Sequence, residues 1–215
     1  MFVGHYAAAM AAKAAEPRAP LWAYVAGCQL VDVGWSGLVM SGVERFRFDP
    51  SLPGSPLDLY HMPWTHSLPA ALLWSLGAAA LMRALRLPWA AAAMVGAAVF
   101  SHWVLDLVVH RPDLELWPGD GKVGFGLWNY PIDEMGVEIG LLAVGGAAWT
   151  ASRKSAQRTA WPAILFIAFL VALHIAARYR GGPAPSTSAF ALTALIAYLA
   201  VSAIAWLVDR RGKTG

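Results

Sequence analysis

The amino-acid sequence predicts an all-α, polytopic transmembrane helix bundle. Of its 215 residues, 58% are hydrophobic and only 13% are charged, which exceeds the apolar content of an ordinary soluble domain. The apolar residues form runs of about 20 rather than alternating stretches of about 10, which favours helices over a transmembrane barrel. We therefore expect about six spans and a short N-terminal helix in a single integral-membrane domain, residues 1–215.

Breaks in the apolar pattern give the expected helices in order. Residues 2–15 read as an Ala-rich helix too short to span, which the proline-containing stretch 17–20 ends. The six spans are expected at 21–40, from Thr65 to Arg86, at 88–110, from Pro131 onward, at 161–177 and at 189–208. The polar, Pro-rich stretch 44–63 is a predicted loop. The stretch 111–130, with its Gly, Pro and bulky aromatic residues, is predicted to cover the bundle at the membrane interface.

The charged residues indicate a membrane location and an orientation. The net charge of +3 does not call for a nucleic-acid partner, because the basic residues gather at helix ends. Of the 16 Lys and Arg residues, the predicted loops place ten on the side of both termini and six on the other side. The positive-inside rule then places both termini in the cytoplasm. The single cysteine, Cys28, excludes an internal disulfide.

The stretch 101–110 carries the sharpest functional signal. His102, Asp106 and His110 recur every four residues in a run otherwise made mostly of Trp, Val and Leu. Side chains four residues apart on a helix are turned by only about 40°, so the three share one face. Side chains at positions i and i+4 can converge on one metal ion, although a single such pair can equally staple two helices together. Ionisable groups inside a membrane are costly and point to a functional site.

Further ionisable residues are predicted to gather at the same level. With the termini in the cytoplasm, six of them lie toward the non-cytoplasmic ends of their spans: His61, His66, His102, Asp106, His110 and Glu134. His5 and Asp32 reach this level if the short N-terminal helix tucks back into the bundle. Imidazole and carboxylate ligands together favour Zn²⁺, and mixtures rich in carboxylate also admit Mn²⁺ or Fe²⁺.

These residues resemble a known family. His5, Asp32, His61, the run Thr65-His66-Ser67 and the run from Ser101-His102 to Asp106 resemble the bacterial membrane-bound metal-dependent hydrolases of the inducible inner-membrane type. They are more distantly similar to zinc-dependent phospholipases C and P1-type nucleases. The resemblance covers residues 1–110 and implies an inner-membrane hydrolase whose metal ligands are His5, Asp32, His61, His66, His102 and Asp106. The family usually has His-Arg-Gly where this chain has His61-Met62-Pro63.

The leading hypothesis is an integral-membrane, metal-dependent hydrolase of a lipid or lipid-linked (phospho)ester. Glu138 or Glu134 would take the proton from the attacking water, with His110 as a further catalytic candidate. Arg178, Arg111 and Ser67 are the candidates for substrate binding, whereas His174 stands alone in an apolar span and is read as a packing residue. One alternative is a metal-ion or proton-coupled transporter, although few polar residues continue toward the opposite face. A bis-His haem protein is the third reading, and it leaves the carboxylates unexplained.

Overall fold

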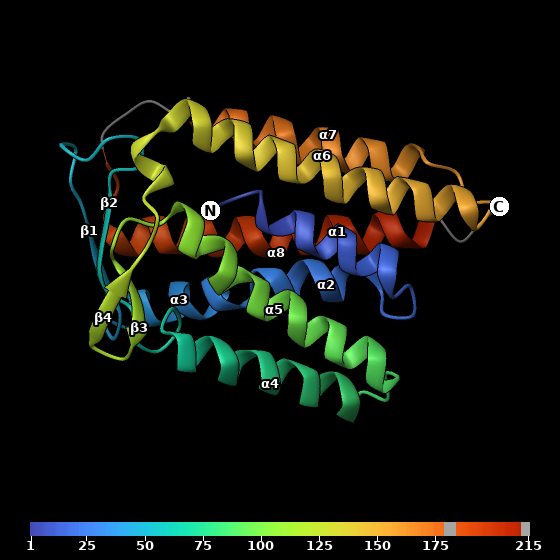
Figure 1. The fold of residues 1–215 in the computed structure, drawn as a ribbon, viewed down its shortest axis with the longest axis horizontal. Coiled ribbons are helices and arrows are strands. Elements are labelled where there is room, and N and C mark those ends of the chain that lie inside the picture. Colours follow the sequence, from blue (N-terminus) through green and yellow to red (C-terminus); the bar gives the residue numbers. More distant parts are fainter. Residues whose placement is uncertain (179–183, 212–215) are drawn as a thin grey trace.

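A computed structural model describes residues 1–178 and 184–211 of the chain. The helices lie side by side along one axis, and two small β-hairpins close one end of the bundle (Figure 1). The described helices are α1 (His5–Ala15), α2 (Leu21–Cys28), α3 (Leu30–Met40), α4 (Leu68–Ala84), α5 (Trp89–Val109), α6 (Pro131–Ser155), α7 (Trp161–Arg178) and α8 (Thr187–Arg211).

Helix α1 tucks back into the bundle, which is the condition under which His5 and Asp32 were expected to reach the level of the other ligands, and it packs against α2, α5 and α6. Val3, Tyr6 and Met10 on this segment are buried in the core. The crossing with α6 is close because α6 has Gly145 there. A Cβ at Gly145 would lie 2.5 Å from the backbone oxygen of Ala7. The N-terminal segment thereby lies inside the molecule rather than on its surface.

The predicted first span, residues 21–40, is not one continuous helix. It breaks at Gln29 into α2 and α3, and Gln29 has backbone angles φ −112° and ψ 6° outside the helical range. The Gln29 side chain donates a hydrogen bond to the backbone oxygen of Phe2, and the Cys28 carbonyl pairs with the His102 ring. At the break, a tertiary partner, the His102 ring, thus takes the place of a helical hydrogen bond to the Cys28 carbonyl.

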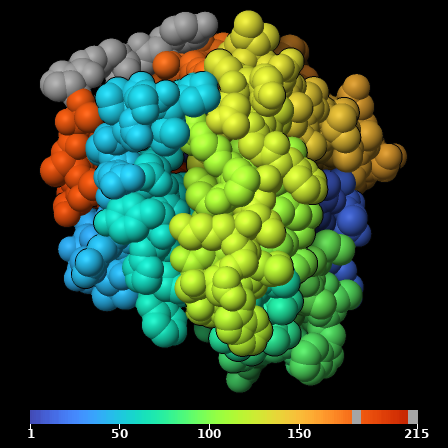
Figure 2. Space-filling view, turned by 60° about the vertical axis from the view of Figure 1, so that its left-hand side comes forward, coloured from blue at the N-terminus to red at the C-terminus, as the bar shows by residue number. Residues whose placement is uncertain are grey.

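The two predicted loops contain β-structure, so the expectation of helices and loops alone was incomplete. Strands β1 (Arg45–Phe48) and β2 (Leu57–His61) pair antiparallel, as do β3 (Leu114–Trp117) and β4 (Asp120–Val123), and a short 3₁₀ helix, η1 (Leu127–Asn129), follows. The two hairpin segments lie side by side across the end of the bundle (Figure 2). The Lys122 ammonium donates a hydrogen bond to the backbone oxygen of Tyr60 at 2.9 Å and so joins the two hairpins. The predicted cover is therefore a pair of hairpins.

Four described helices are long and apolar enough to cross a membrane: α5, α6, α7 and residues 187–209 of α8. Helices α3 and α4 are apolar but shorter, with 11 and 17 residues. The prediction of a helical membrane bundle is confirmed in this coarser form, whereas the count of six spans stays a prediction. The main core lies among the helices, away from the hairpin end, and contains large apolar side chains such as Tyr24, Leu142, Trp149 and Phe166.

Candidate functional site

Four histidines and two aspartates from five parts of the chain meet near the hairpin end of the bundle. His5 opens α1, Asp32 lies in the first turn of α3, and His66 precedes α4. His102 and Asp106 lie late in α5, and His110 directly follows it. All are buried except Asp32, which is partly exposed. We call these six residues the His–Asp cluster.

The two carboxylates of the cluster bridge the four imidazoles. Asp106 places Oδ1 3.1 Å from His5 Nε2 and Oδ2 3.1 Å from His102 Nε2, and the same Oδ2 lies 3.5 Å from His110 Nε2 and 3.7 Å from His66 Nε2. Asp32 Oδ1 lies 3.4 Å from His66 Nε2 and 3.5 Å from His102 Nε2. Each histidine thus presents the same nitrogen to the centre.

The other nitrogen of three of these rings is held from outside. His102 Nδ1 lies 2.8 Å from the Cys28 carbonyl, and His110 Nδ1 lies 2.9 Å from Asp113 Oδ1. His66 Nδ1 lies 2.8 Å from the Thr65 hydroxyl, which itself donates to Glu44 Oε2 at 2.7 Å. All three outer groups act as acceptors, so Nδ1 of each ring carries a proton. In its neutral form each ring then aims the lone pair of Nε2 at the carboxylates.

Lone pairs that face carboxylates require positive charge between them, either protons on the rings or a metal ion. Protonating several adjacent buried rings is unfavourable, because like charges in a medium of low polarity repel strongly. The Met1 amine, 2.8 Å from Asp106 Oδ1, already supplies one positive charge. The His5 ring is fully buried and stacks on the His102 ring at 3.8 Å between centroids, so protons on both rings at once would repel.

The spacing of the cluster fits a metal ion. Four ligand atoms placed 2.0–2.1 Å from a tetrahedral zinc ion lie about 3.3–3.4 Å from one another. The distances between nitrogen and oxygen atoms in the cluster range from 3.1 to 3.7 Å. In addition, Nε2 of His5 and of His102 is buried without a hydrogen bond. His5, His102 and Asp106 form one group suited to a metal ion, and Asp32, His66 and His102 form another.

Three other predicted site residues have local structural contacts. His61 lies on β2 opposite Arg45 and is not in either of these groups among the described residues. Ser67 caps α4, since its hydroxyl accepts from the Ala70 amide at 3.3 Å. The Arg111 guanidinium donates hydrogen bonds to the backbone oxygen of Ser55 at 2.8 Å and to Asn129 Oδ1 at 2.9 Å, so it joins the loops of the cover.

A second polar group lies beside the N-terminal segment. Glu134, Glu138 and His174 are buried and close enough to share one ion. Glu138 accepts hydrogen bonds from the amides of Phe2 at 2.9 Å and Gly4 at 2.8 Å. Glu134 Oε2 has no hydrogen bond and lies 3.8 Å from the Arg178 guanidinium. Residues 1–5 therefore lie between the two polar groups. Phe2 and Gly4 contact Glu138, and the Met1 amine and His5 contact the His–Asp cluster.

Sequence reasoning missed several of these residues. His174 was read as a packing residue, yet its Nδ1 lies 3.9 Å from Glu138 Oε2. Its position one turn before Arg178, at the end of the span nearest the predicted site, was the available signal. Asp113, three residues after His110, could have been found in the same way. Glu44 and the Cys28 carbonyl gave no signal, because their roles arise from contacts between distant parts of the chain.

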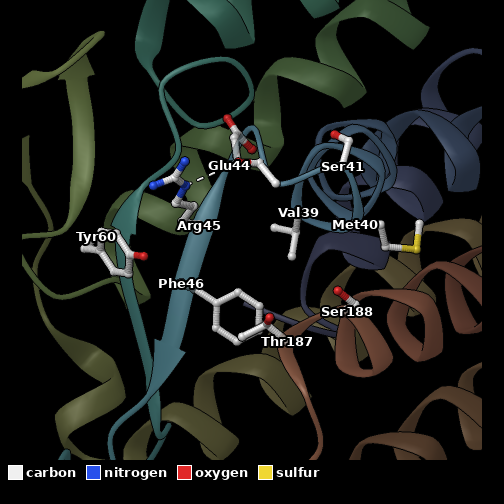
Figure 3. Close-up of a pocket in the computed structure, with 10 residues that line it drawn as sticks. Val39, Met40, Ser41, Glu44, Arg45, Phe46, Tyr60, Thr187 and Ser188 are labelled. Atoms are coloured by element: carbon white, nitrogen blue, oxygen red, sulfur yellow. Dashed lines mark hydrogen bonds between the residues drawn. The ribbon is translucent and has the colours of Figure 1, made fainter.

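A hollow near the site is lined by different residues. It has a volume of about 430 Å³ and lies between the end of α3, strand β1 and the start of α8, with Met40, Phe46 and Ser188 on its walls (Figure 3). The described residues that line it include none of the His–Asp cluster. It approaches the cluster through Glu44, whose carboxylate holds Thr65 beside His66.

Fold and site together define a class: a helical membrane protein with a buried cluster of histidine and aspartate side chains under a β-hairpin cover. Comparison with protein families agrees with the membrane part of this description. Residues 1–181 match the family described as YdjM inner membrane protein, and the chain belongs to this family. Comparisons with curated proteins and with solved structures gave no match. The family supports the predicted inner-membrane location.

Proposed function

We propose that this protein is an integral-membrane, metal-dependent hydrolase that cleaves a lipid or lipid-linked phosphoester. One observation carries the proposal: histidine Nε2 atoms converge on the carboxylates of Asp32 and Asp106 at 3.1–3.7 Å. The outer hydrogen bonds turn the lone pairs of three rings inward. Such a preorganised set of N and O ligands is what a catalytic metal site requires.

The metal ligands would be His5, Asp32, His66, His102 and Asp106, and His110 joins them through Asp106. Mixed imidazole and carboxylate ligands favour Zn²⁺, with Mn²⁺ or Fe²⁺ as the other candidates. A bound metal ion would lower the pKa of a water molecule to about 7 and polarise the ester oxygen. His61, which lies on β2 outside the cluster, is left out of the proposed ligand set.

Hydrolysis also requires a group that takes the proton of the attacking water and returns one to the leaving oxygen. Glu138 and Glu134 were both candidates. Glu138 already accepts hydrogen bonds from two backbone amides, which favours a role in holding residues 2–4 beside the cluster. Glu134 has a buried oxygen without a hydrogen bond and is the stronger candidate for the proton acceptor. Arg178 beside it can pair with a phosphate oxygen.

The location of the site favours a lipid substrate. The cluster is buried near one end of a bundle whose exposed side chains include many leucines, and the family is an inner-membrane family. A substrate with an apolar tail can remain in the bilayer while its ester reaches the site. The excess of Lys and Arg at the opposite end supports a site on the non-cytoplasmic side. Asp209 near the end of α8 lies beside Lys13 at that opposite end, whereas the Met1 amine contacts Asp106 at the site end, so the prediction that both termini are cytoplasmic is corrected for the N-terminus.

The alternatives receive less support from the geometry. A transporter needs a polar route to the opposite face. The described core instead has apolar side chains such as Met10, Val95 and Leu142 between the cluster and the buried charges at the opposite end, Lys13, Arg153 and Asp209. A bis-His haem site needs two imidazoles on opposite sides of a porphyrin. The rings of His5 and His102 are instead stacked, with centroids 3.8 Å apart and planes 9° apart, which leaves no space for one.

The test is turnover of defined lipid phosphoesters by the purified protein in nanodiscs. We expect hydrolysis by the wild type, and a fall of at least about 10²-fold in the Asp106→Asn variant, which keeps the shape but loses the charge. Metal uptake into liposomes is measured on the same preparation. Metal flux without hydrolysis of any phospholipid or polyprenyl phosphate would contradict the proposed hydrolase and support the transporter instead.

A further inference from the structure

A groove on the outer face of α4 leads toward the His–Asp cluster. It has a volume of about 560 Å³, within the range of about 300–1,000 Å³ that is usual for ligand sites. Small residues along α4, including Gly77 and Ala78, line the groove, and Leu73, Trp74 and Leu81 border it. We propose that this groove binds one hydrocarbon chain of the lipid substrate. This inference rests on the proposed function and names the part of the substrate that the chain recognises.

The chemistry of the groove fits a hydrocarbon chain. The described residues that line it include no charged side chain, and Ser67 is the polar residue closest to the cluster. Leu73 and Leu81 are 69% and 55% exposed, so the groove opens on an apolar surface. In a membrane such a surface contacts lipid rather than water, and contact with a lipid chain fills the groove at no cost in polar desolvation.

The groove is positioned so that a head group can reach the cluster. Its outer end is bordered by Pro63, Trp64 and Ser67, and His66 lies between the last two in the sequence. Pro118, from the turn between β3 and β4, also lines the groove and belongs to the cover. Leu30, at the start of α3, borders the same groove. A chain lying along α4 therefore brings its head group close to the proposed ligand His66, whose Nε2 lies 3.4 Å from Asp32 Oδ1.

Two tryptophans give the groove a fixed shape. The Trp74 indole donates a hydrogen bond to the Trp64 backbone oxygen at 3.0 Å. The Trp74 ring also packs against α3, where a Cβ at Gly34 would lie 2.9 Å from the ring. Glycine at position 34 thus lets the ring approach α3 closely. The wall of the groove is consequently preformed, which reduces the entropy lost when a chain binds.

The test fills the groove with a side chain. Gly77 lines the groove, and a Cβ there would meet no atom within 4 Å, so Gly77→Leu adds a side chain at the groove from a position with open space. Gly140 on α6 is also exposed and free of contacts within 4 Å, which makes Gly140→Leu a matched control for the same change on another helix. The probe is a phospholipid with a photoactivatable acyl chain in nanodiscs, and the labelled peptides are identified by mass spectrometry.

We expect labelling of the α4 peptide in the wild type and in Gly140→Leu, and a loss of at least about fivefold in Gly77→Leu. Equal labelling of α4 in all three proteins, or labelling spread evenly over α6, α7 and α8, would overturn the proposal. In turnover assays, Gly77→Leu should raise the KM for a long-chain substrate by about tenfold, as expected for lost contacts in an apolar pocket, and leave a dihexanoyl substrate unaffected. An equal effect on both substrates would also contradict it.

The two readouts separate the groove from the hydrolase reaction. Labelling does not need turnover, so specific labelling of α4 in a protein without hydrolase activity would refute the proposed function and keep the lipid groove. Turnover of long-chain lipid that is unaffected by Gly77→Leu would keep the function and remove the groove from it.

Discussion

His102 Nε2 lies 3.1 Å from Asp106 Oδ2, one turn later on the same helix, while His102 Nδ1 lies 2.8 Å from the Cys28 carbonyl at the break between α2 and α3. The sequence showed the i, i+4 spacing of His102 and Asp106. It did not show the break between α2 and α3 that supplies the Cys28 carbonyl as the partner of His102 Nδ1. Together these two contacts fix both nitrogens of the ring. The ring is thereby oriented before any ion binds, and such preorganisation raises metal affinity.

The first prediction concerns metal content. His102→Ala and Asp106→Ala should each lose most of the bound Zn²⁺, because His102 belongs to both candidate groups and the Asp106 carboxylate lies within 3.7 Å of all four imidazoles. Elemental analysis of folded protein provides the measurement. His61→Ala, outside the cluster, is the control and should retain the metal. Full zinc occupancy in both cluster variants would show that His102 and Asp106 contact each other within α5 without binding the metal.

The second prediction concerns the outer contact of His66. The Thr65 hydroxyl accepts from His66 Nδ1 and donates to Glu44, so Thr65→Val should lower metal affinity by about 10–100-fold without removing a ligand. Competition with a chelator of known affinity measures the change. Thr193→Val, at an exposed position on α8, should have no effect. Unchanged affinity in Thr65→Val would show that this contact does not orient His66.

The third prediction separates the two glutamates. Glu134→Gln should lower turnover by about 10²–10⁴-fold while the metal stays bound, because it removes a proton acceptor. Glu138→Gln should instead lower turnover together with metal content, since the N-terminal segment it holds carries His5. Wild-type turnover in Glu134→Gln with metal bound would exclude this residue as the base.

The fourth prediction concerns orientation. In a Cys28→Ser background, a cysteine at Asp120 in the exposed β3–β4 hairpin should react with an impermeant thiol reagent added outside intact cells. A cysteine at Ser155, at the exposed far end of α6, should stay unlabelled. The opposite pattern would turn the cluster toward the cytoplasm and change the accessible substrates.

The sequence predicted the helical bundle and three residues of the cluster from regular patterns, whereas His5, Asp32 and His66 were included through their expected level in the membrane and a resemblance. Apolar runs indicated helices, and a four-residue spacing placed His102, Asp106 and His110 on one face. The hairpins were missed, because strands of four or five residues in loops rich in Pro and Gly give little periodic signal. The break at Gln29 was missed because the hydrogen bonds around it come from Phe2 and His102. His61 was included both through its position in the chain and through the resemblance, but it lies on β2 outside the groups suited to a metal ion among the described residues.

The most direct test of the proposed metal-dependent hydrolase is phosphoester turnover before and after removal of the metal. Purified protein in nanodiscs is treated with a chelator, and turnover of a long-chain lipid phosphoester is measured alongside zinc content. We predict that turnover falls in proportion to zinc content and returns when Zn²⁺ is added back to the wild type but not to His102→Ala. Turnover that persists in protein free of metal would contradict the proposed mechanism.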